Sequence, residues 1–139
     1  MLTVDSNLEN IQLISNYVKE IAKDCFNIAQ LMEIEQAVIE AVNNCVKHAY
    51  GYSDQHPITI QCNLLDNNLL IEIIDEGKPF DVRCLDELNA DFDFDPLDIA
   101  NLPESGLGLK IIKIYMDKVS YHREDNKNRW LFKKKFLSH

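Results

Sequence analysis

Apolar residues recur every three or four positions in three segments of the chain, a spacing that places them on one face of a helix. The predicted helices span residues 7–23, 30–49 and about 109–117. Ser6 and Glu9 stand at the start of the first helix in the Ser-x-x-Glu order of a capping box. Gly51 follows the second helix, where a residue with positive φ often ends a helix.

Strands are predicted where short apolar or alternating runs are bounded by turn residues. They span residues 1–4, 57–64, 69–75, 119–123 and 129–136. The segments 65–68 and 125–128 are typical of hairpin turns, so the strands around them should pair antiparallel. Helices and hairpins in this order predict an α+β two-layer sandwich, with helices covering one face of a mixed, mainly antiparallel sheet.

The segment from about residue 81 to 105 has weak periodicity and contains Pro96 and Pro103. It is too long for an ordinary connection in a compact domain. We interpret it as a lid or binding loop within a single domain that spans residues 1–139.

Composition narrows the class of protein. The chain has 139 residues and is 46% apolar, enough for one sizeable core. A net charge of −9 argues against nucleic-acid binding, because counterion release rewards lysine and arginine. No apolar run approaches the roughly 20 residues that span a bilayer. With no basic N-terminal region and four widely spaced cysteines, a cytoplasmic protein with free thiols is expected.

The second predicted helix carries an unusual polar face. Glu40, Asn44 and His48 are four residues apart, and Lys47 lies three residues after Asn44. A solvated face is the ordinary explanation of such a pattern. Asparagine competes with helical backbone bonding, however, so Asn43 and Asn44 in mid-helix suggest a further role.

Two other segments place glycine beside polar residues at the ends of elements. In the first, Asp75 follows an apolar strand, and a carboxylate there can accept a hydrogen bond from an exocyclic amine such as that of adenine. Gly77 would leave room for a flat ring, and Pro79 and Phe80 would wall it in. An ordinary Asp-x-Gly turn is the alternative for this segment taken alone.

The second of these segments, Ser105-Gly106-Leu107-Gly108-Leu109, opens the third helix. Exposed amides and the helix dipole make such an opening an anion site, although a flexible hinge would look the same. The segment is not a phosphate-binding loop of the GxxxxGK[ST] type, since that pattern is absent. It also lacks the third glycine and the preceding strand of a dinucleotide-binding turn.

Taken together, the three segments resemble the N, G1 and G2 boxes of the GHKL ATPase superfamily, in the same order along the chain. The boxes correspond to residues 40–50, 75–81 and 105–109. The surrounding stretches EAVNNCVKHAYG and SGLGLKIIKIYMDKVSY are similar to the small anti-sigma factor serine/threonine kinases, which oppose STAS-domain anti-anti-sigma proteins. The resemblance covers nearly the whole chain and implies a Bergerat ATP-binding fold.

The resemblance implies a role for each matching residue. Glu40 would be the general base for an incoming serine, Asn44 would ligate Mg²⁺, and Asp75 would bind the adenine amine of ATP. The other expected nucleotide contacts are Lys47, His48, Gly77, Pro79, Phe80, Ser105, Gly106, Leu107, Gly108 and Leu109. The expected partners are a STAS-domain protein, a sigma factor and a second copy of the chain.

One position departs from the family pattern. Glu104 stands where the family often has an arginine, which would help with phosphate or partner contact. A non-catalytic module that sequesters a partner in a nucleotide-dependent way therefore stays open as an alternative. A detached catalytic domain of a histidine kinase is a third interpretation, because such domains share the three boxes.

Overall fold

The computed structural model describes residues 1–53, 55–80 and 104–137, without the side chains of residues 104–107. The expected lid therefore lies almost entirely outside the described residues. The described elements, in chain order, are β1 (Leu2–Asp5), η1 (Leu8–Asn10), α1 (Ile11–Ala22), α2 (Ile28–Asn44), η2 (Cys45–Ala49), β2 (Pro57–Leu65), β3 (Asn68–Asp75), α4 (Glu104–Tyr115), β4 (Lys118–Glu124) and β5 (Lys127–Lys135).

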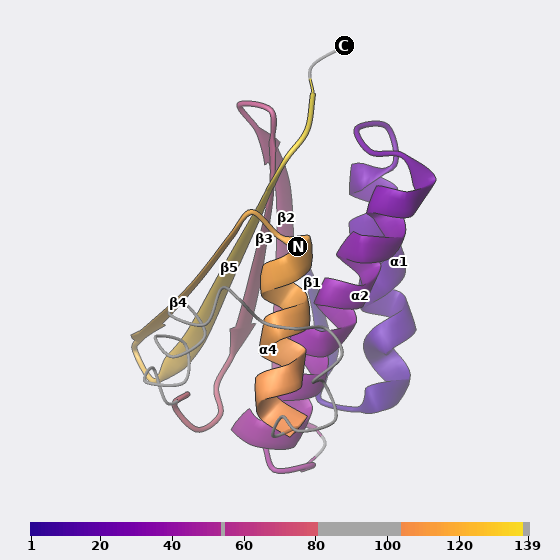
Figure 1. Ribbon diagram of the computed structural model, residues 1–139. Coiled ribbons are helices and arrows are strands. Elements are labelled where there is room, and N and C mark those ends of the chain that lie inside the picture. Colours follow the sequence, from indigo (N-terminus) through magenta and orange to yellow (C-terminus); the bar gives the residue numbers. More distant parts are fainter. Residues whose placement is uncertain (54, 81–103, 138–139) are drawn as a thin grey trace.

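The structure has two layers (Figure 1). The strands form one sheet in the order β1-β2-β3-β5-β4, and α1, α2 and α4 cover one of its faces. The predicted α+β sandwich is confirmed. Each strand pair of the described sheet is antiparallel, so the parallel component of the expected mixed sheet is not found there.

The core lies between the sheet and the helices, and strand periodicity decides which residues enter it. Side chains alternate between the two faces of a strand. In β3 the buried positions are therefore Leu69, Ile71, Ile73 and Asp75. The last position of this inward row is a carboxylate, so the strand carries Asp75 to the helix side at the end of the sheet.

The capping pattern predicted at Ser6 and Glu9 is wrong. Asn7 caps η1 instead, with its side-chain oxygen accepting from the backbone nitrogen of Glu9 over 2.9 Å. The hydroxyl of Ser6 is buried and donates to the carbonyl oxygen of Ser53 over 2.7 Å. This long-range bond takes the hydroxyl away from the helix, and no local sequence signal reveals it.

Helices α2 and α4 differ slightly from their predicted bounds. A capping box formed by Asn27 and Gln30 begins α2, and its last turn widens into the π-helix η2. Gly51 follows with a φ of +57°, as expected for a residue that ends a helix. Helix α4 already begins at Glu104, so Gly106 and Gly108 lie within its first turns and not before it. No described helix is both long and apolar enough to cross a membrane.

Candidate functional site

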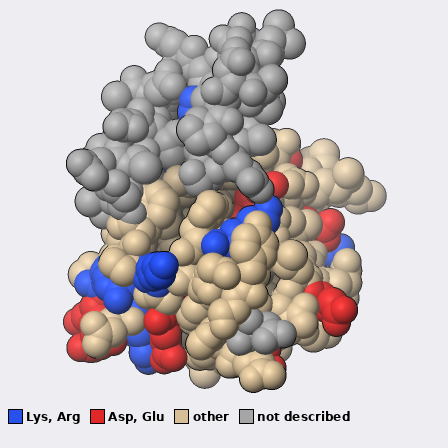
Figure 2. All heavy atoms as spheres, turned by 90° about the horizontal axis from the view of Figure 1, so that it is seen from below, with Lys and Arg blue, Asp and Glu red and all other residues tan. Residues whose placement is uncertain are grey.

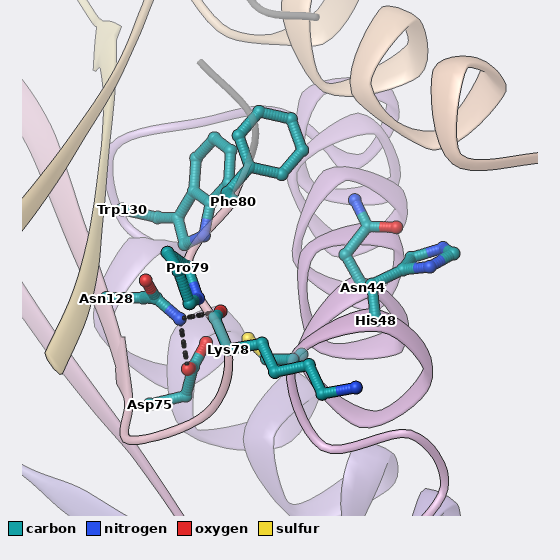
Figure 3. A pocket seen from close by; sticks show the side chains of 10 residues that line it. Asn44, His48, Asp75, Lys78, Pro79, Phe80, Asn128 and Trp130 are labelled. Carbon is teal, nitrogen blue, oxygen red and sulfur yellow. Dashed lines mark hydrogen bonds between the residues drawn. The ribbon is translucent and has the colours of Figure 1, made fainter. Parts of the chain in front are cut away.

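A cavity of about 210 Å³ lies between the end of α2 with η2 on one side and the end of β3 with the start of β5 on the other. Five residues singled out from the sequence line it: Asn44, His48, Asp75, Pro79 and Phe80. Asn44 and His48 come from the helix side, and the other three come from the sheet side (Figure 3). Residues from two segments distant in the sequence thus share one pocket.

Asp75 is the fixed centre of this pocket. The residue is 1% exposed, and Oδ1 accepts hydrogen bonds from the backbone nitrogen of Gly77 over 2.9 Å and from Nδ2 of Asn128 over 2.7 Å. Cys45 lines the same cavity, and the pKa of its thiol is raised well above the usual range by burial and by the neighbouring Asp75. An ionised carboxylate has about four acceptor sites, so capacity remains for an exocyclic amine.

Asn128 ties the turn after β3 to the β4–β5 hairpin. Its Nδ2 also donates to the carbonyl oxygen of Lys78 over 2.7 Å (Figure 3). Its Oδ1 accepts from the hydroxyl of Tyr121 over 2.5 Å and from Nη1 of Arg123 over 2.9 Å. Arg123 donates further to the carbonyl oxygen of Gly77 over 3.0 Å. All polar atoms of the buried Asn128 side chain are thereby paired, which fixes its orientation toward Asp75.

Asn128 escapes prediction from the sequence, because it stands beside Asp125 and Asn126 in a segment typical of a turn. The sequence signal that could have revealed Asn128 is the alternation of buried residues along its strand. Trp130 and Phe132 face the core, so the same alternation places Asn128 on the inward face of β5. Trp130, Cys45 and Lys78, which also line the cavity, carry no comparable polar pattern in the sequence.

An aromatic cluster forms the apolar wall of the pocket. The ring centroids of Phe80 and Trp130 are 4.9 Å apart, and those of Tyr121 and Trp130 are 4.8 Å apart. The backbone nitrogen of Phe80 donates to the Tyr121 hydroxyl over 3.0 Å. The cavity of about 210 Å³ is smaller than the roughly 300–1,000 Å³ of pockets for drug-sized ligands. A flat heterocycle fits this space, and the rest of a nucleotide would extend beyond it.

The structure gives a packing reason for the glycine at position 77. A Cβ at residue 77 would lie 2.4 Å from the carbonyl oxygen of Ala49, so glycine is needed for the turn to pack against η2. The backbone nitrogen of Lys78 donates to the same carbonyl oxygen over 2.9 Å. The hydroxyl of Tyr50 donates to the carbonyl oxygen of Pro57 and accepts from the backbone nitrogen of Glu76, and burial raises the pKa of this hydroxyl to about 12.

Glu40 lies one helical turn before Asn44, beside the cavity and not among the residues that line it. Helix α4 packs across this part of α2 at Gly108. A Cβ at residue 108 would lie 3.1 Å from Oε2 of Glu40 and 3.5 Å from Oδ1 of Asn44. The segments around Glu40 and Gly108, which are distant in sequence, therefore meet in the structure.

The remaining predicted residues are placed less directly. Lys47 is partly buried and does not line the cavity, whereas Leu109 is buried in the core. Ser105, Gly106 and Leu107 belong to the first turns of α4, and their side chains lie outside the described residues.

On the end of the molecule seen in Figure 2, basic and acidic side chains lie next to one another.

The described residues include no group of three or more His, Cys, Asp or Glu side chains that could hold a metal ion. Asn44 offers one amide oxygen beside the pocket. Mg²⁺ often takes only one or two protein ligands when phosphate and water oxygens complete its octahedron. The donor set therefore suits Mg²⁺ delivered with a nucleotide better than a resident metal held by the protein alone.

Comparisons with known proteins agree with this geometry. The chain matches the family model of the histidine kinase-like ATPase domain over residues 4–134. It is 31% identical over 112 residues to the anti-sigma F factor of Caldanaerobacter subterraneus subsp. tengcongensis, covering 79% of this chain and 73% of that protein. It is 38% identical over 89 residues to the serine-protein kinase RsbW of Staphylococcus aureus, covering 63% of this chain and 55% of RsbW.

A solved structure supports the fold independently. The catalytic domain of the histidine kinase ThkA superimposes with a TM-score of 0.60 over 98% of both chains. The sequence identity of 16% is low, so this likeness bears on the fold alone.

Proposed function

The chain belongs to the histidine kinase-like ATPase domain family, among the anti-sigma factor kinases of the GHKL type, and we propose that it is an ATP-dependent serine/threonine protein kinase. The observation that carries the proposal is the pocket that joins Asp75 to Asn44, with Glu40 one helical turn away. A pure nucleotide binder has little use for a carboxylate in that place.

The pocket geometry supports adenine recognition. Asp75 is buried, fixed by Gly77 and Asn128, and keeps acceptor capacity for the amine at adenine C6. Phe80 and Trp130 offer aromatic surface for the ring. The phosphates would then extend along α2 toward Asn44 and the first turns of α4, whose backbone amides and helix dipole favour anions.

The proposed reaction is transfer of the γ-phosphoryl group to a serine hydroxyl. The serine oxygen forms a bond to the γ-phosphorus, the bond from that phosphorus to the β,γ-bridging oxygen breaks, and ADP leaves with that electron pair. Glu40 accepts the proton that the serine hydroxyl loses. Mg²⁺ bound through Asn44 would neutralise charge on the phosphate oxygens, and positioning supplies most of the remaining catalysis.

The proposed partner is a STAS-domain anti-anti-sigma protein, with a sigma factor as the regulated target. In this scheme the kinase holds or releases the sigma factor according to the phosphorylation of the STAS protein. The support is the similarity to proteins named anti-sigma F factor and serine-protein kinase RsbW.

We expect the purified protein to place phosphate on a serine of its cognate STAS-domain partner when Mg-ATP is present. Mass spectrometry of the partner identifies the modified residue, and omission of Mg²⁺ is the control. Tight nucleotide-dependent binding without any transfer would contradict the kinase proposal. That result would support the sequestering module instead.

Replacing Asp75 by asparagine should weaken ATP binding by roughly 10- to 100-fold, because a hydrogen bond to a charged acceptor contributes about 1.5–3 kcal/mol. The asparagine oxygen can face either Gly77 and Asn128 or the adenine amine. In both orientations its own amide donor meets another donor. Isothermal titration calorimetry with ATP measures the loss.

Asp66→Asn in the β2–β3 turn is the matched control and should bind like the wild type. Equal affinity of Asp75→Asn and Asp66→Asn for ATP would show that Asp75 does not contact the base. Thermal unfolding without ligand tests whether the folded state survives each change.

A further inference from the structure

The carboxylate of Glu40 receives a hydrogen bond from its own helix. Nε2 of Gln36 donates to Oε1 of Glu40 over 2.9 Å. The two residues are four positions apart, so they lie on neighbouring turns of α2. A glutamine oxygen would repel the carboxylate, which fixes the amide with its nitrogen toward Glu40.

The second carboxylate oxygen has different surroundings. Oε2 of Glu40 faces α4 at Gly108, where a Cβ would lie 3.1 Å away. The amide of Asn44 borders the same spot, with its Oδ1 at 3.5 Å from that Cβ position. Oε1 thus accepts a hydrogen bond from Gln36. Oε2 lies toward Asn44, which is proposed to ligate Mg²⁺ beside the phosphates.

A general base works only when the accepting oxygen is within hydrogen-bond reach of the proton. Glutamate has three rotatable side-chain bonds, and a partly exposed carboxylate samples several rotamers unless a neighbour restrains it. Supporting hydrogen bonds of this kind hold catalytic side chains in productive geometry.

We infer that Gln36 is a positioning residue for phosphoryl transfer: it holds Oε1 of Glu40 so that Oε2 accepts the proton of the serine hydroxyl. The inference rests on the proposed function. In this role Gln36 contacts neither the nucleotide nor the serine. It affects the rate of phosphoryl transfer only by orienting the carboxylate of Glu40.

The test measures the single-turnover rate of serine phosphorylation at saturating Mg-ATP. Gln36→Met removes the donor while keeping the length and helix propensity of the side chain. We expect the rate to fall about tenfold, in line with loss of a hydrogen bond to a charged group. The KM for ATP should stay within about twofold of wild type, because the nucleotide pocket is untouched.

Two further variants separate positioning from a structural effect. Gln36→His supplies a neutral N–H donor at an assay pH of about 8 and should restore most of the rate, whereas a lysine ammonium would lower the proton affinity of Glu40. Gln12→Met breaks a matched bond on α1, where Nε2 of Gln12 donates to Oδ1 of Asn16 over 2.8 Å, and should transfer phosphate at the wild-type rate.

A Gln36→Met variant as fast as Gln12→Met would overturn the inference, and so would a Gln36→His variant as slow as Gln36→Met. Both results are read against a wild-type protein that phosphorylates its partner. A wild-type protein that transfers no phosphate overturns the proposed function and this inference together.

Discussion

Replacing Glu40 by glutamine should lower the rate of serine phosphorylation by roughly 10²- to 10⁴-fold, the range that general-base catalysis contributes. Glutamine keeps the size of the side chain and can still accept the bond from Gln36, but it cannot take up the serine proton. ATP affinity should be almost unchanged, because the residues that line the cavity do not include Glu40. The effect should therefore appear in kcat and not in the KM for ATP.

Single-turnover phosphorylation of the partner measures this loss, with ATP binding followed by calorimetry on the same sample. Glu20→Gln is the control, since it makes the same change on α1 at a side chain that is 73% exposed and paired with Lys23. Phosphorylation by Glu40→Gln at the rate of Glu20→Gln would remove Glu40 from the proposed mechanism. Loss of ATP binding in Glu40→Gln would instead give Glu40 a role in holding the nucleotide.

The site could be predicted from the sequence where a regular period determines the direction of a side chain. The inward row of β3 ends at Asp75, and the four-residue spacing along α2 aligns Glu40 with Asn44. These two rules bring Asp75 and Asn44 to one cavity, with Glu40 one helical turn away, once the helix covers the sheet. The fold class follows from the same periods, because the hairpins require antiparallel neighbours.

The parts that escaped prediction depend on contacts between distant segments. The hydroxyl of Ser6 bonds to the carbonyl oxygen of Ser53, so it does not cap the helix that its local sequence suggests. Asn128 gains its role only because the β4–β5 hairpin lies against the turn after Asp75. Sequence spacing can place Asn128 on the inward face of its strand, but only tertiary packing decides which residues it contacts.

At Gly77 the structure shows a packing reason for glycine that the sequence does not reveal. The sequence suggests that glycine makes room for a ligand ring, whereas its missing Cβ makes room for the carbonyl oxygen of Ala49. The turn that carries Lys78 and Phe80 therefore docks on η2, and the pocket wall depends on that docking. If the cavity binds the nucleotide as proposed, binding and stability should be coupled at this position.

Replacing Gly77 by alanine should destabilise the protein by about 2–3 kcal/mol, the upper part of the range for overpacking a tightly packed site. A Cβ at 2.4 Å from backbone oxygen cannot be accommodated by rotating a side chain, so the turn itself must move. Movement would break the bonds from Gly77 to Asp75 and from Lys78 to Ala49. Thermal unfolding should show a midpoint lower by roughly 6–12 °C.

Gly51→Ala separates this steric effect from backbone strain. Gly51 has a φ of +57°, but no atom lies within 4 Å of a Cβ built there, so alanine would meet strain without a clash. That strain is about 1–2 kcal/mol. ATP affinity should be measured at a temperature where both variants are folded. Gly77→Ala should lose most of its ATP affinity, because the displaced turn holds Asp75 and Phe80. Gly51→Ala should keep its ATP affinity. The two variants could instead have the same unfolding midpoint and the same ATP affinity. That result would show that packing of the turn against η2 does not hold the pocket wall in place.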